Sequence, residues 1–364
     1  MGVRCMKILI DIDHPAHVHF FKGTIRHLSD AGHEIMVVTR NKEMTLDLLE
    51  EYGFHYINIG DHKTGMAGKA FALLQFDYRI FRIARKFRPD LLVALGSPYL
   101  AHVSKLIRKP YISFWDTEDA NLIIKLTSPF TDTICTPSCF LRDFGERQVR
   151  FEGYKELAYL HPKEFSPDAS VLDELNLTVD DRFIIVRFIS WAASHDVGLK
   201  GMKNPVEVVK TLEQYGQVFI SSERPPEPVL EKYLLHISPE KFHSLLAYAS
   251  LYIGEGGTIT TEAAVVGTPA IHIEANANGE ATGTTSGNFL ELRDKYGLMY
   301  FYPDQDAALE KAVQILENPH SKREWQQKKE RLLADKINVS AWMTDFITNY
   351  PESCHNYQNE RDSQ

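Results

Sequence analysis

The stretch Tyr252-Ile-Gly-Glu-Gly-Gly-Thr-Ile-Thr-Thr-Glu262-Ala-Ala-Val-Val-Gly267-Thr-Pro269-Ala-Ile-His272 decides the fold of this chain. It predicts a strand, a glycine turn, a helix that starts near Thr258, and a second strand. Glycines at a helix start let a diphosphate approach the backbone N–H groups. Glu262, about one turn into the helix, could accept hydrogen bonds from a ribose. The pattern outlines a nucleotide-sugar site; the alternative is a close-packed crossover whose glycines serve only the turn.

The composition is that of a large globular protein with interspersed charges. The 364 residues include 40 Lys and Arg against 49 Asp and Glu, a net charge of −9, and 44% are apolar. Two domains with sizeable cores are expected, whereas nucleic-acid binding is not, because it requires clustered basic residues. A solvated helix face or a patch for peripheral contact with an anionic membrane would explain one basic run at helical spacing. The run consists of Arg79, Arg82, Arg85, Lys86 and Arg88.

The cysteines and the N-terminus suggest an intracellular setting. Cys135 and Cys139 have no second pair at zinc-ligand spacing, so reduced structural thiols, no metal and no cofactor are expected. The segment from Met1 to Asp11 is too short, and charged too soon, for a signal peptide. No stretch reaches the apolar length of a transmembrane helix. The sequence therefore predicts a cytoplasmic protein, and it does not indicate the oligomeric state.

Strand and helix patterns alternate through the first half of the chain. Short apolar runs predict buried parallel strands, and apolar residues at helical spacing predict helices between them. The expected strands are Lys7–Ile12, Glu34–Thr39, Phe54–Ile59, Leu91–Leu95 and Tyr111–Phe114. The expected helices are His17–Leu28, Met44–Tyr52, Lys69–Phe87 and a short one before Tyr111. This order predicts a doubly wound parallel sheet, which binds ligands at the carboxyl ends of its strands.

The alternation breaks between Phe151 and Asp181, where turn formers predict an interdomain crossing, and then resumes. Further strands are expected over 182–189, 217–222 and 297–302, and helices over 206–215, 239–249 and 307–347. We expect an N-terminal domain over residues 6–155, a linker over 156–181 and a nucleotide-sugar-binding domain over 182–335. A helix over 336–350 should return to the first domain, and a disordered tail should follow over 351–364.

The chain resembles the GT-B superfamily, which covers glycosyltransferases and the non-hydrolysing UDP-sugar 2-epimerases. Its segment 256–270 is similar to the donor-binding segment of peptidoglycan N-acetylglucosaminyltransferases, with the same glycine-to-glutamate spacing and Glu-x4-Gly-x-Pro ending. The resemblance implies an α/β architecture of two Rossmann-like domains facing across a cleft. It also implies a nucleotide-sugar partner, most simply a UDP-sugar, with Gly256, Gly257 and Thr258 facing the diphosphate and Glu262 contacting the ribose.

Residues 6–350 more closely resemble a prokaryotic family of GT-B-like proteins whose activity is unassigned. Two segments carry this likeness: Asp11-Ile-Asp-His-Pro-Ala-His-Val-His-Phe-Phe-Lys22 and Gly153-Tyr-Lys-Glu-Leu-Ala-Tyr-Leu-His-Pro162. Pro15-Ala16 departs from the glycine-rich loop that GT-B transferases have after the first strand. The resemblance therefore implies the fold more strongly than it implies a reaction.

Acidic and histidine side chains gather where the first strand meets the first helix, the ligand-facing end of a parallel sheet. Asp13 and His14 are candidate substrate-binding residues. His17, in the first helical turn, is a candidate general base because a positive helix terminus favours its neutral form. Two alternatives stay open. The histidines could be structural and hydrogen-bonded, or Asp11, Asp13, His14 and His17 could bind a metal.

A second acidic cluster, Trp115-Asp116-Thr117-Glu118, follows the strand Tyr111–Phe114. Asp116 or Glu118 could match the glutamate that takes part in acid–base chemistry in the 2-epimerases; the alternative is that Asp116 or Thr117 caps the next helix. An acid that follows the preceding strand in epimerases is replaced by Gly96-Ser97-Pro98. This replacement favours glycosyl transfer over epimerisation as the predicted reaction.

Small polar residues follow the first strand of the second half, and Ser190 and His195 are candidate contacts for a phosphate or acceptor. The sequence thus predicts metal-independent glycosyl transfer from a nucleotide-diphosphate sugar, as in surface polysaccharide or glycoconjugate synthesis. His17, Asp116 or Glu118 would deprotonate the acceptor, and the helix start would stabilise the departing diphosphate. The alternatives are a UDP-sugar 2-epimerase-like enzyme and a non-catalytic binding or scaffold protein.

Overall fold

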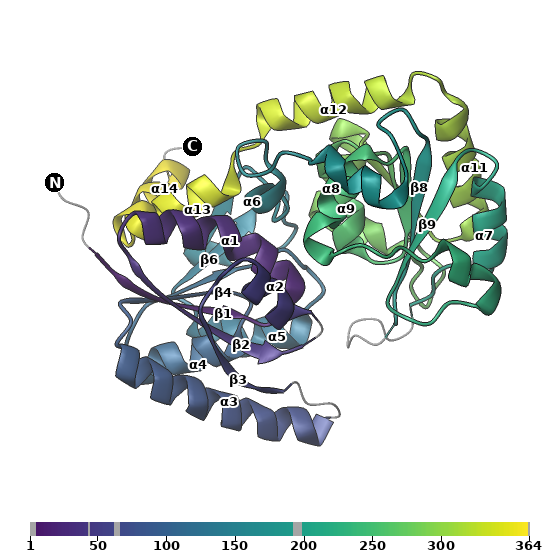
Figure 1. Ribbon diagram of the computed structural model, residues 1–364. Coiled ribbons are helices and arrows are strands. Elements are labelled where there is room, and N and C mark those ends of the chain that lie inside the picture. Colours follow the sequence, from purple (N-terminus) through teal and green to yellow (C-terminus); the bar gives the residue numbers. More distant parts are fainter. Residues whose placement is uncertain (1–4, 43, 62–65, 192–198, 363–364) are drawn as a thin grey trace. The chain divides into compact units, whose positions relative to one another are not determined.

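The computed structural model describes residues 5–42, 44–61, 66–191 and 199–362, although not the side chains of 66–72 and 359–362 (Figure 1). The chain folds as two compact units, the first formed by Met1–Glu164 with Ile337–Gln364 and the second by Phe165–Lys336. The stretch predicted as a linker is divided between them. Its helix α6 (Leu157–Leu160) buries all of its side chains in the first unit, and η3 (Ala169–Leu175) belongs to the second.

The first unit contains a seven-stranded parallel sheet with strand order β3-β2-β1-β4-β5-β6-β7. Its strands are β1 (Lys7–Ile12), β2 (Glu34–Asn41), β3 (Tyr56–Asp61), β4 (Leu91–Leu95), β5 (Tyr111–Phe114), β6 (Thr133–Pro137) and β7 (Gln148–Phe151). Neither β6 nor β7 was predicted. The register pairs Asp11 on β1 with Val38 on β2 and with Ala94 on β4, so these three strands end at one edge.

Helices cover both faces of this sheet. They are α1 (Pro15–Asp30), α2 (Thr45–Glu51), α3 (Met66–Phe87), α4 (Pro98–Ile107), α5 (Asn121–Thr127), α6, α13 (Val339–Thr348) and α14 (Glu352–Asp362). Figure 1 shows α1 and α13 on one face and α3 and α4 on the other. The prediction of disorder is wrong for the described part of the tail, because α14 is anchored by the buried Cys354 and by Tyr357, whose hydroxyl accepts a hydrogen bond from Trp342 Nε1.

The second unit contains a five-stranded parallel sheet with strand order β12-β11-β10-β8-β9. Its strands are β8 (Phe183–Phe188), β9 (Gln217–Ser222), β10 (Leu251–Gly254), β11 (Ala270–Ile273) and β12 (Met299–Tyr302). Its main helices are α7 (Pro205–Leu212), α8 (Phe242–Tyr248), α9 (Gly257–Val266), α10 (Gly287–Glu291), α11 (Gln305–Glu317) and α12 (Ser321–Asp335). Helices α7 and α11 pack on one face, and α8, α9 and α12 on the other (Figure 1).

Both sheets are parallel throughout, and their cores are the apolar runs that the sequence predicted. Ile8, Leu9 and Ile10 of β1 and Leu251 and Ile253 of β10 are completely buried. None of the described helices combines the length and apolarity needed to cross a bilayer.

Candidate functional site

The carboxyl ends of β1, β2 and β4 carry a buried charge network centred on Arg40. Arg40 Nη2 lies 2.9 Å from Asp13 Oδ2 and 3.2 Å from Asp11 Oδ2. Ser97 Oγ donates a further hydrogen bond to Asp11, and the guanidinium of Arg40 lies 4.4 Å from the ring centre of Tyr99. Arg40 and Asp11 are each only 2% exposed. Asp11 therefore holds the network together, while Asp13 reaches its more exposed edge.

Asp13 and His17 form the pair best suited to proton transfer. His17 Nδ1 lies 2.9 Å from Asp13 Oδ1, and the two residues are one helical turn apart in sequence. Burial alone would raise the pKa of Asp13, but Arg40 and His17 outweigh burial and hold that pKa well below its ordinary value. Asp13 is therefore a carboxylate at neutral pH. Nδ1 of His17 thus lies beside this carboxylate as an ion-pair contact without a directed hydrogen bond, and Nε2 is the ring nitrogen that points away from Asp13.

His14 plays a different part from His17. Its Nδ1 accepts a hydrogen bond from the backbone N–H of Ala16, at 3.1 Å, and so caps the N-terminus of α1. Burial, with the nearby charges of His17 and Lys42, lowers the pKa of His14 to about 3. A neutral ring whose Nδ1 is an acceptor carries its proton on Nε2. His14 is thus neutral at pH 7 and acts as a helix cap, and it is not a base.

Asp116 and Glu118 have different interaction partners. Lys155 Nζ lies 2.5 Å from Asp116 Oδ2 and 3.6 Å from Glu156 Oε1. Burial by itself would raise the pKa of Asp116, but the ammonium group of Lys155 outweighs it and lowers that pKa. Glu118 is buried and accepts a hydrogen bond from the backbone N–H of Leu141 at 3.3 Å. Lys155 therefore keeps Asp116 a carboxylate and makes it less able to accept a proton.

The alternative reading of Asp116 and Thr117 as helix caps is wrong. Helix α5 begins after Ala120, and no side chain caps it. Asp116 is instead committed to Lys155, a residue 39 positions further along the chain.

Replacing Lys155 with methionine should lower the free energy of unfolding at pH 7 by about 3 kcal/mol, because it leaves the Asp116 carboxylate, whose side chain is only 17% exposed, without its cation. The lowered pKa of Asp116 means that the pair stabilises the wild-type protein above the ordinary value of 3.8, and that this stabilisation is lost as the pH falls through the lowered value. The loss in the variant should therefore shrink on acidification. Urea unfolding at pH 7 and at about pH 3, below the ordinary value, measures both effects.

Lys105→Met is the matched control, because Lys105 Nζ makes a 2.6 Å contact with Asp132 in which both side chains are more than a third exposed. It should cost less than about 1 kcal/mol. Lys155→Met combined with Asp116→Asn should recover most of the lost stability. Equal stability of Lys155→Met and the wild-type protein would show that water, and not Lys155, stabilises the carboxylate.

In the second unit, the predicted glycine turn joins β10 to α9. Gly256 has a φ of +82° and occupies the N-cap of α9, where no side chain makes a capping hydrogen bond. Residues 256–259 are partly exposed, whereas Thr260 and the rest of the helix are buried. The first turn of α9, which includes Gly257 and Thr258, is thus partly exposed and has no side-chain cap, an arrangement that suits an anion, which the helix dipole also favours.

Glu262, predicted to contact a ribose, is only 4% exposed. Its Oε1 lies 3.1 Å from His243 Nε2, and His243 on α8 is equally buried. This partner was not predicted, since His243 lies on another helix. Glu262 is held in one orientation by His243, so its contact with a ribose remains a prediction.

A second carboxylate, Glu255, lies directly before the glycine turn. It is 1% exposed and accepts hydrogen bonds from the backbone N–H groups of Ile189 and Met202, at 3.0 and 2.8 Å. Burial raises the pKa of Glu255. These bonds fasten the segment that follows β8 to the glycine turn.

Ser190 lies on that segment. Its backbone N–H and its Oγ both donate to Glu223 Oε2, at 3.1 and 3.2 Å, and Glu223 also pairs with Arg187. His195, the other predicted contact in this segment, lies outside the described residues.

Comparison with known proteins identifies the family of this chain and solved structures with a similar fold. An uncharacterised protein of Methanocaldococcus jannaschii is 27% identical over 278 residues, which are 73% of this chain and 81% of that protein. A Staphylococcus aureus protein, MnaA, solved with UDP, has a TM-score of 0.68 at 12% identity and covers 96% of this chain and 97% of its own.

Two further solved structures are similar along nearly their whole length. The spinosyn forosaminyltransferase SpnP has a TM-score of 0.63 at 13% identity, over 97% of this chain and 100% of its own. The UDP-GlcNAc 2-epimerase of Neisseria meningitidis, bound to UDP-GlcNAc, has a TM-score of 0.60 at 12% identity, over 93% and 98%. At these identities the likeness shows the fold alone, and it confirms the predicted GT-B class with two Rossmann-like units.

The sequence resemblance to a family without an assigned activity is confirmed as well. The chain belongs to the family described as "Protein of unknown function (DUF354)", whose model matches residues 6–341.

Proposed function

We propose that the protein is a glycosyltransferase that takes a sugar from a nucleotide-diphosphate donor, most simply a UDP-sugar, and passes it to a hydroxyl acceptor without a metal ion. The observation that carries this proposal is the uncapped first turn of α9, with Gly256 at a φ of +82° and the following residues partly exposed. Solved structures of the same fold hold UDP and UDP-GlcNAc, which supports a nucleotide-sugar ligand.

The two units divide the chemistry in this proposal. In the first, Nε2 of His17 takes the proton of the acceptor hydroxyl, and Asp13 stabilises the imidazolium that results. The acceptor oxygen bonds to the anomeric carbon as the bond from that carbon to the diphosphate oxygen breaks. The leaving diphosphate gains one negative charge, which the first-turn N–H groups of α9 stabilise in place of a metal.

Epimerisation is the second candidate because 2-epimerases share the fold. The end of β4, where the resemblance expects an epimerase acid, carries Ser97, and its hydroxyl donates to Asp11 and caps α4. Asp11 itself is buried and bound by Arg40. The first unit therefore lacks an accessible carboxyl group at this position, which favours transfer.

Incubation with UDP-GlcNAc alone, followed by NMR of the anomeric protons, separates the two reactions. A transferase without an acceptor should release UDP slowly by hydrolysis and leave the C2 configuration of the sugar unchanged. Accumulation of the C2 epimer would show that the protein is an epimerase and would contradict the proposed transfer. A panel of UDP-, dTDP- and GDP-sugars extends the test to other donors, and the absence of turnover with all of them, despite binding, would leave a non-catalytic nucleotide-sugar-binding protein.

A further inference from the structure

The outer face of α3 combines exposed apolar and basic side chains. Leu74 is 71% exposed and Tyr78 is 61% exposed. At about 100° per residue, Arg82 and Arg85 fall on the same side of the helix, within about 80° of Leu74. Tyr78 and Arg82 also contact each other, with the guanidinium 6.0 Å from the ring centre. The four residues form one stripe, which we call the α3 stripe.

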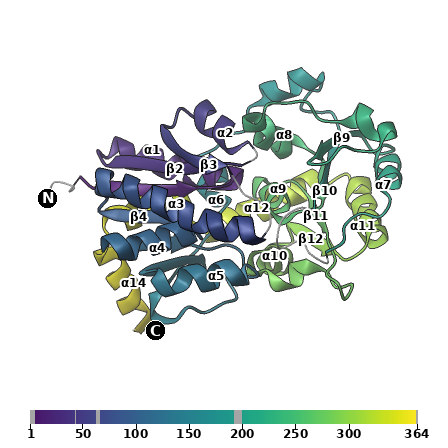
Figure 2. The ribbon, with the colours of Figure 1, turned by 90° about the horizontal axis from the view of Figure 1, so that it is seen from below.

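The other side of α3 is fixed to the sheet. Phe76, Ile80, Ala84 and Phe87 are buried in the same core cluster as Leu9 and Leu92. Figure 2 shows α3 outermost on this face of the first unit, with α4 beside it. The packing therefore determines which residues of α3 point outward, and it leaves Leu74 and Tyr78 in solvent.

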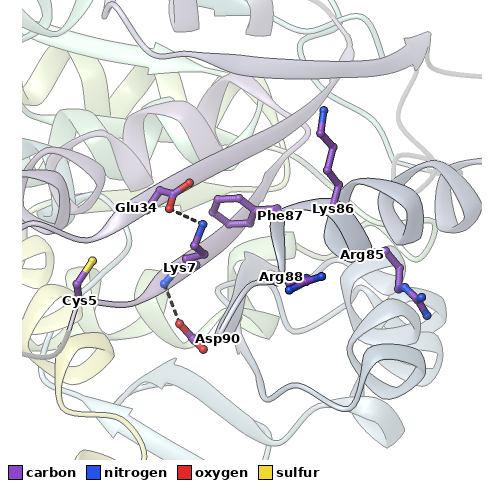
Figure 3. A pocket seen from close by; sticks show the side chains of 8 residues that line it. All are labelled: Cys5, Lys7, Glu34, Arg85, Lys86, Phe87, Arg88 and Asp90. Carbon is purple, nitrogen blue, oxygen red and sulfur yellow. Dashed lines mark hydrogen bonds and ion pairs between the residues drawn. The ribbon is translucent and has the colours of Figure 1, made fainter.

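A shallow pocket of about 690 Å³ continues the α3 stripe at the C-terminal end of the helix. Figure 3 shows its lining side chains: Cys5, Lys7, Glu34, Arg85, Lys86, Phe87, Arg88 and Asp90. Both acids are already engaged. Glu34 pairs with Lys7 Nζ at 2.6 Å, and Asp90 accepts from the Lys7 backbone N–H at 3.1 Å and contacts Lys109 Nζ at 3.4 Å.

The remaining cations are not neutralised. In the part of the chain that the structure describes, no carboxylate lies within ion-pair distance of Arg82, Arg85, Lys86 or Arg88. Arg79 is different, because it donates to the backbone carbonyl of Ile59. The α3 stripe and the pocket thus form a basic surface on a protein whose net charge is −9.

We propose that the α3 stripe and the adjoining pocket dock the protein on an anionic membrane surface. Arg82, Arg85, Lys86 and Arg88 would face lipid phosphates, and Leu74 and Tyr78 would enter the interfacial region, as in helices that lie on a bilayer. Two large exposed apolar side chains within the basic surface favour a lipid surface over nucleic acid, which does not require them. Solvated cations that only complement the dipole at the end of α3 would explain the charges but not Leu74 and Tyr78.

Co-sedimentation of the full-length protein with vesicles tests this proposal. Vesicles of 30% phosphatidylglycerol in phosphatidylcholine should bind the protein, and pure phosphatidylcholine vesicles should bind it much less. Arg82→Glu combined with Arg85→Glu should lower the partition coefficient about 20-fold or more, because each basic residue near an anionic surface contributes about a factor of five. Leu74→Ser should weaken binding to the same vesicles without changing its salt dependence.

The matched control is Lys210→Glu combined with Arg323→Glu, which makes the same charge change at exposed positions of the second unit. It should leave most of the binding intact, and unchanged thermal midpoints should show that both double variants are folded. The proposal is overturned if the two double variants bind equally, if anionic vesicles bind no better than neutral ones, or if Leu74→Ser converts an oligomer to a monomer, since the stripe would then be an interface between copies of the chain.

Discussion

His17→Gln should lower the rate of glycosyl transfer by about 10²–10⁴-fold, because glutamine cannot accept the proton of the acceptor hydroxyl. The affinity for the nucleotide should not change, since His17 lies in the first unit and the proposed diphosphate site is in the second. Steady-state rates measured with a turned-over donor, together with calorimetric titration of UDP, separate the two quantities. A fall in kcat at constant nucleotide affinity is the expected signature.

His27→Gln is the control for this substitution. His27 lies on the same helix and also contacts a carboxylate, with its Nε2 3.5 Å from Glu164 Oε2, but it is far along α1 from the strand ends. Its replacement should leave the rate within about twofold. A rate for His17→Gln close to that of the wild-type protein would remove His17 as the base and return Asp116 or Glu118 to consideration.

Gly256→Ala should weaken nucleotide binding about tenfold or more. At a φ of +82° a side chain is strained, and an added Cβ would lie 3.0 Å from the side chain of Ile189. Relief of that strain must turn the backbone and redirect the N–H groups of the first turn of α9, each of which contributes about 1.5–3 kcal/mol in a bond to a charged group. Calorimetric titration of UDP gives the change in Kd directly.

Gly53→Ala provides a comparison with similar backbone strain. Gly53 has a φ of +72°, nothing lies within 4 Å of an added Cβ, and it lies in the first unit. The Gly53→Ala protein should lose about as much stability as the Gly256→Ala protein, while its affinity for the nucleotide should stay the same. Unchanged affinity in Gly256→Ala would contradict the assignment of the diphosphate to this turn.

The sequence predicted most of the strands and missed β6 and β7, which are short and carry several polar residues. Strands β1, β4 and β5 were predicted with the bounds that the structure has. In β6 and β7, Thr133, Gln148 and Arg150 interrupt the apolar pattern. Part of their hydrogen bonding comes from residues on other elements; for example, Gln148 Nε2 donates to Thr136 Oγ1 at 2.9 Å. The residue pattern of a single strand does not indicate such partners.

The candidate site was only partly predictable for the same reason. The clustering of Asp13, His14 and His17 follows from local sequence, because all three adjoin the first turn of one helix. Arg40 at the end of β2 and Lys155 in the segment before α6 were missed, because a charged residue is expected to be solvated unless its partner is known. The one available signal for Arg40 was its place at the end of β2, the neighbour of β1 in a doubly wound sheet, opposite two aspartates.

Side-chain contacts in the structure also distinguish two histidine roles that the sequence could not distinguish. His14 and His17 are both histidines at the start of α1, yet one caps the helix through Nδ1 and the other faces Asp13. The sequence similarly suggests that Glu262 is an exposed helical acid, whereas in the structure His243 on α8 packs against it. Such distinctions depend on the positions of side chains from other elements.

Thermal unfolding of the protein in the presence of UDP, dTDP, GDP and their sugars tests the central claim most directly, with Gly256→Ala as the control. A ligand at about 100 times its Kd adds about 2.7 kcal/mol to the stability of the folded state. We predict a raised Tm with at least one nucleoside diphosphate in the wild-type protein and little or no shift in Gly256→Ala. An unchanged Tm with every nucleotide, or the same shift in both proteins, would contradict the assignment of a nucleotide-sugar site to the start of α9.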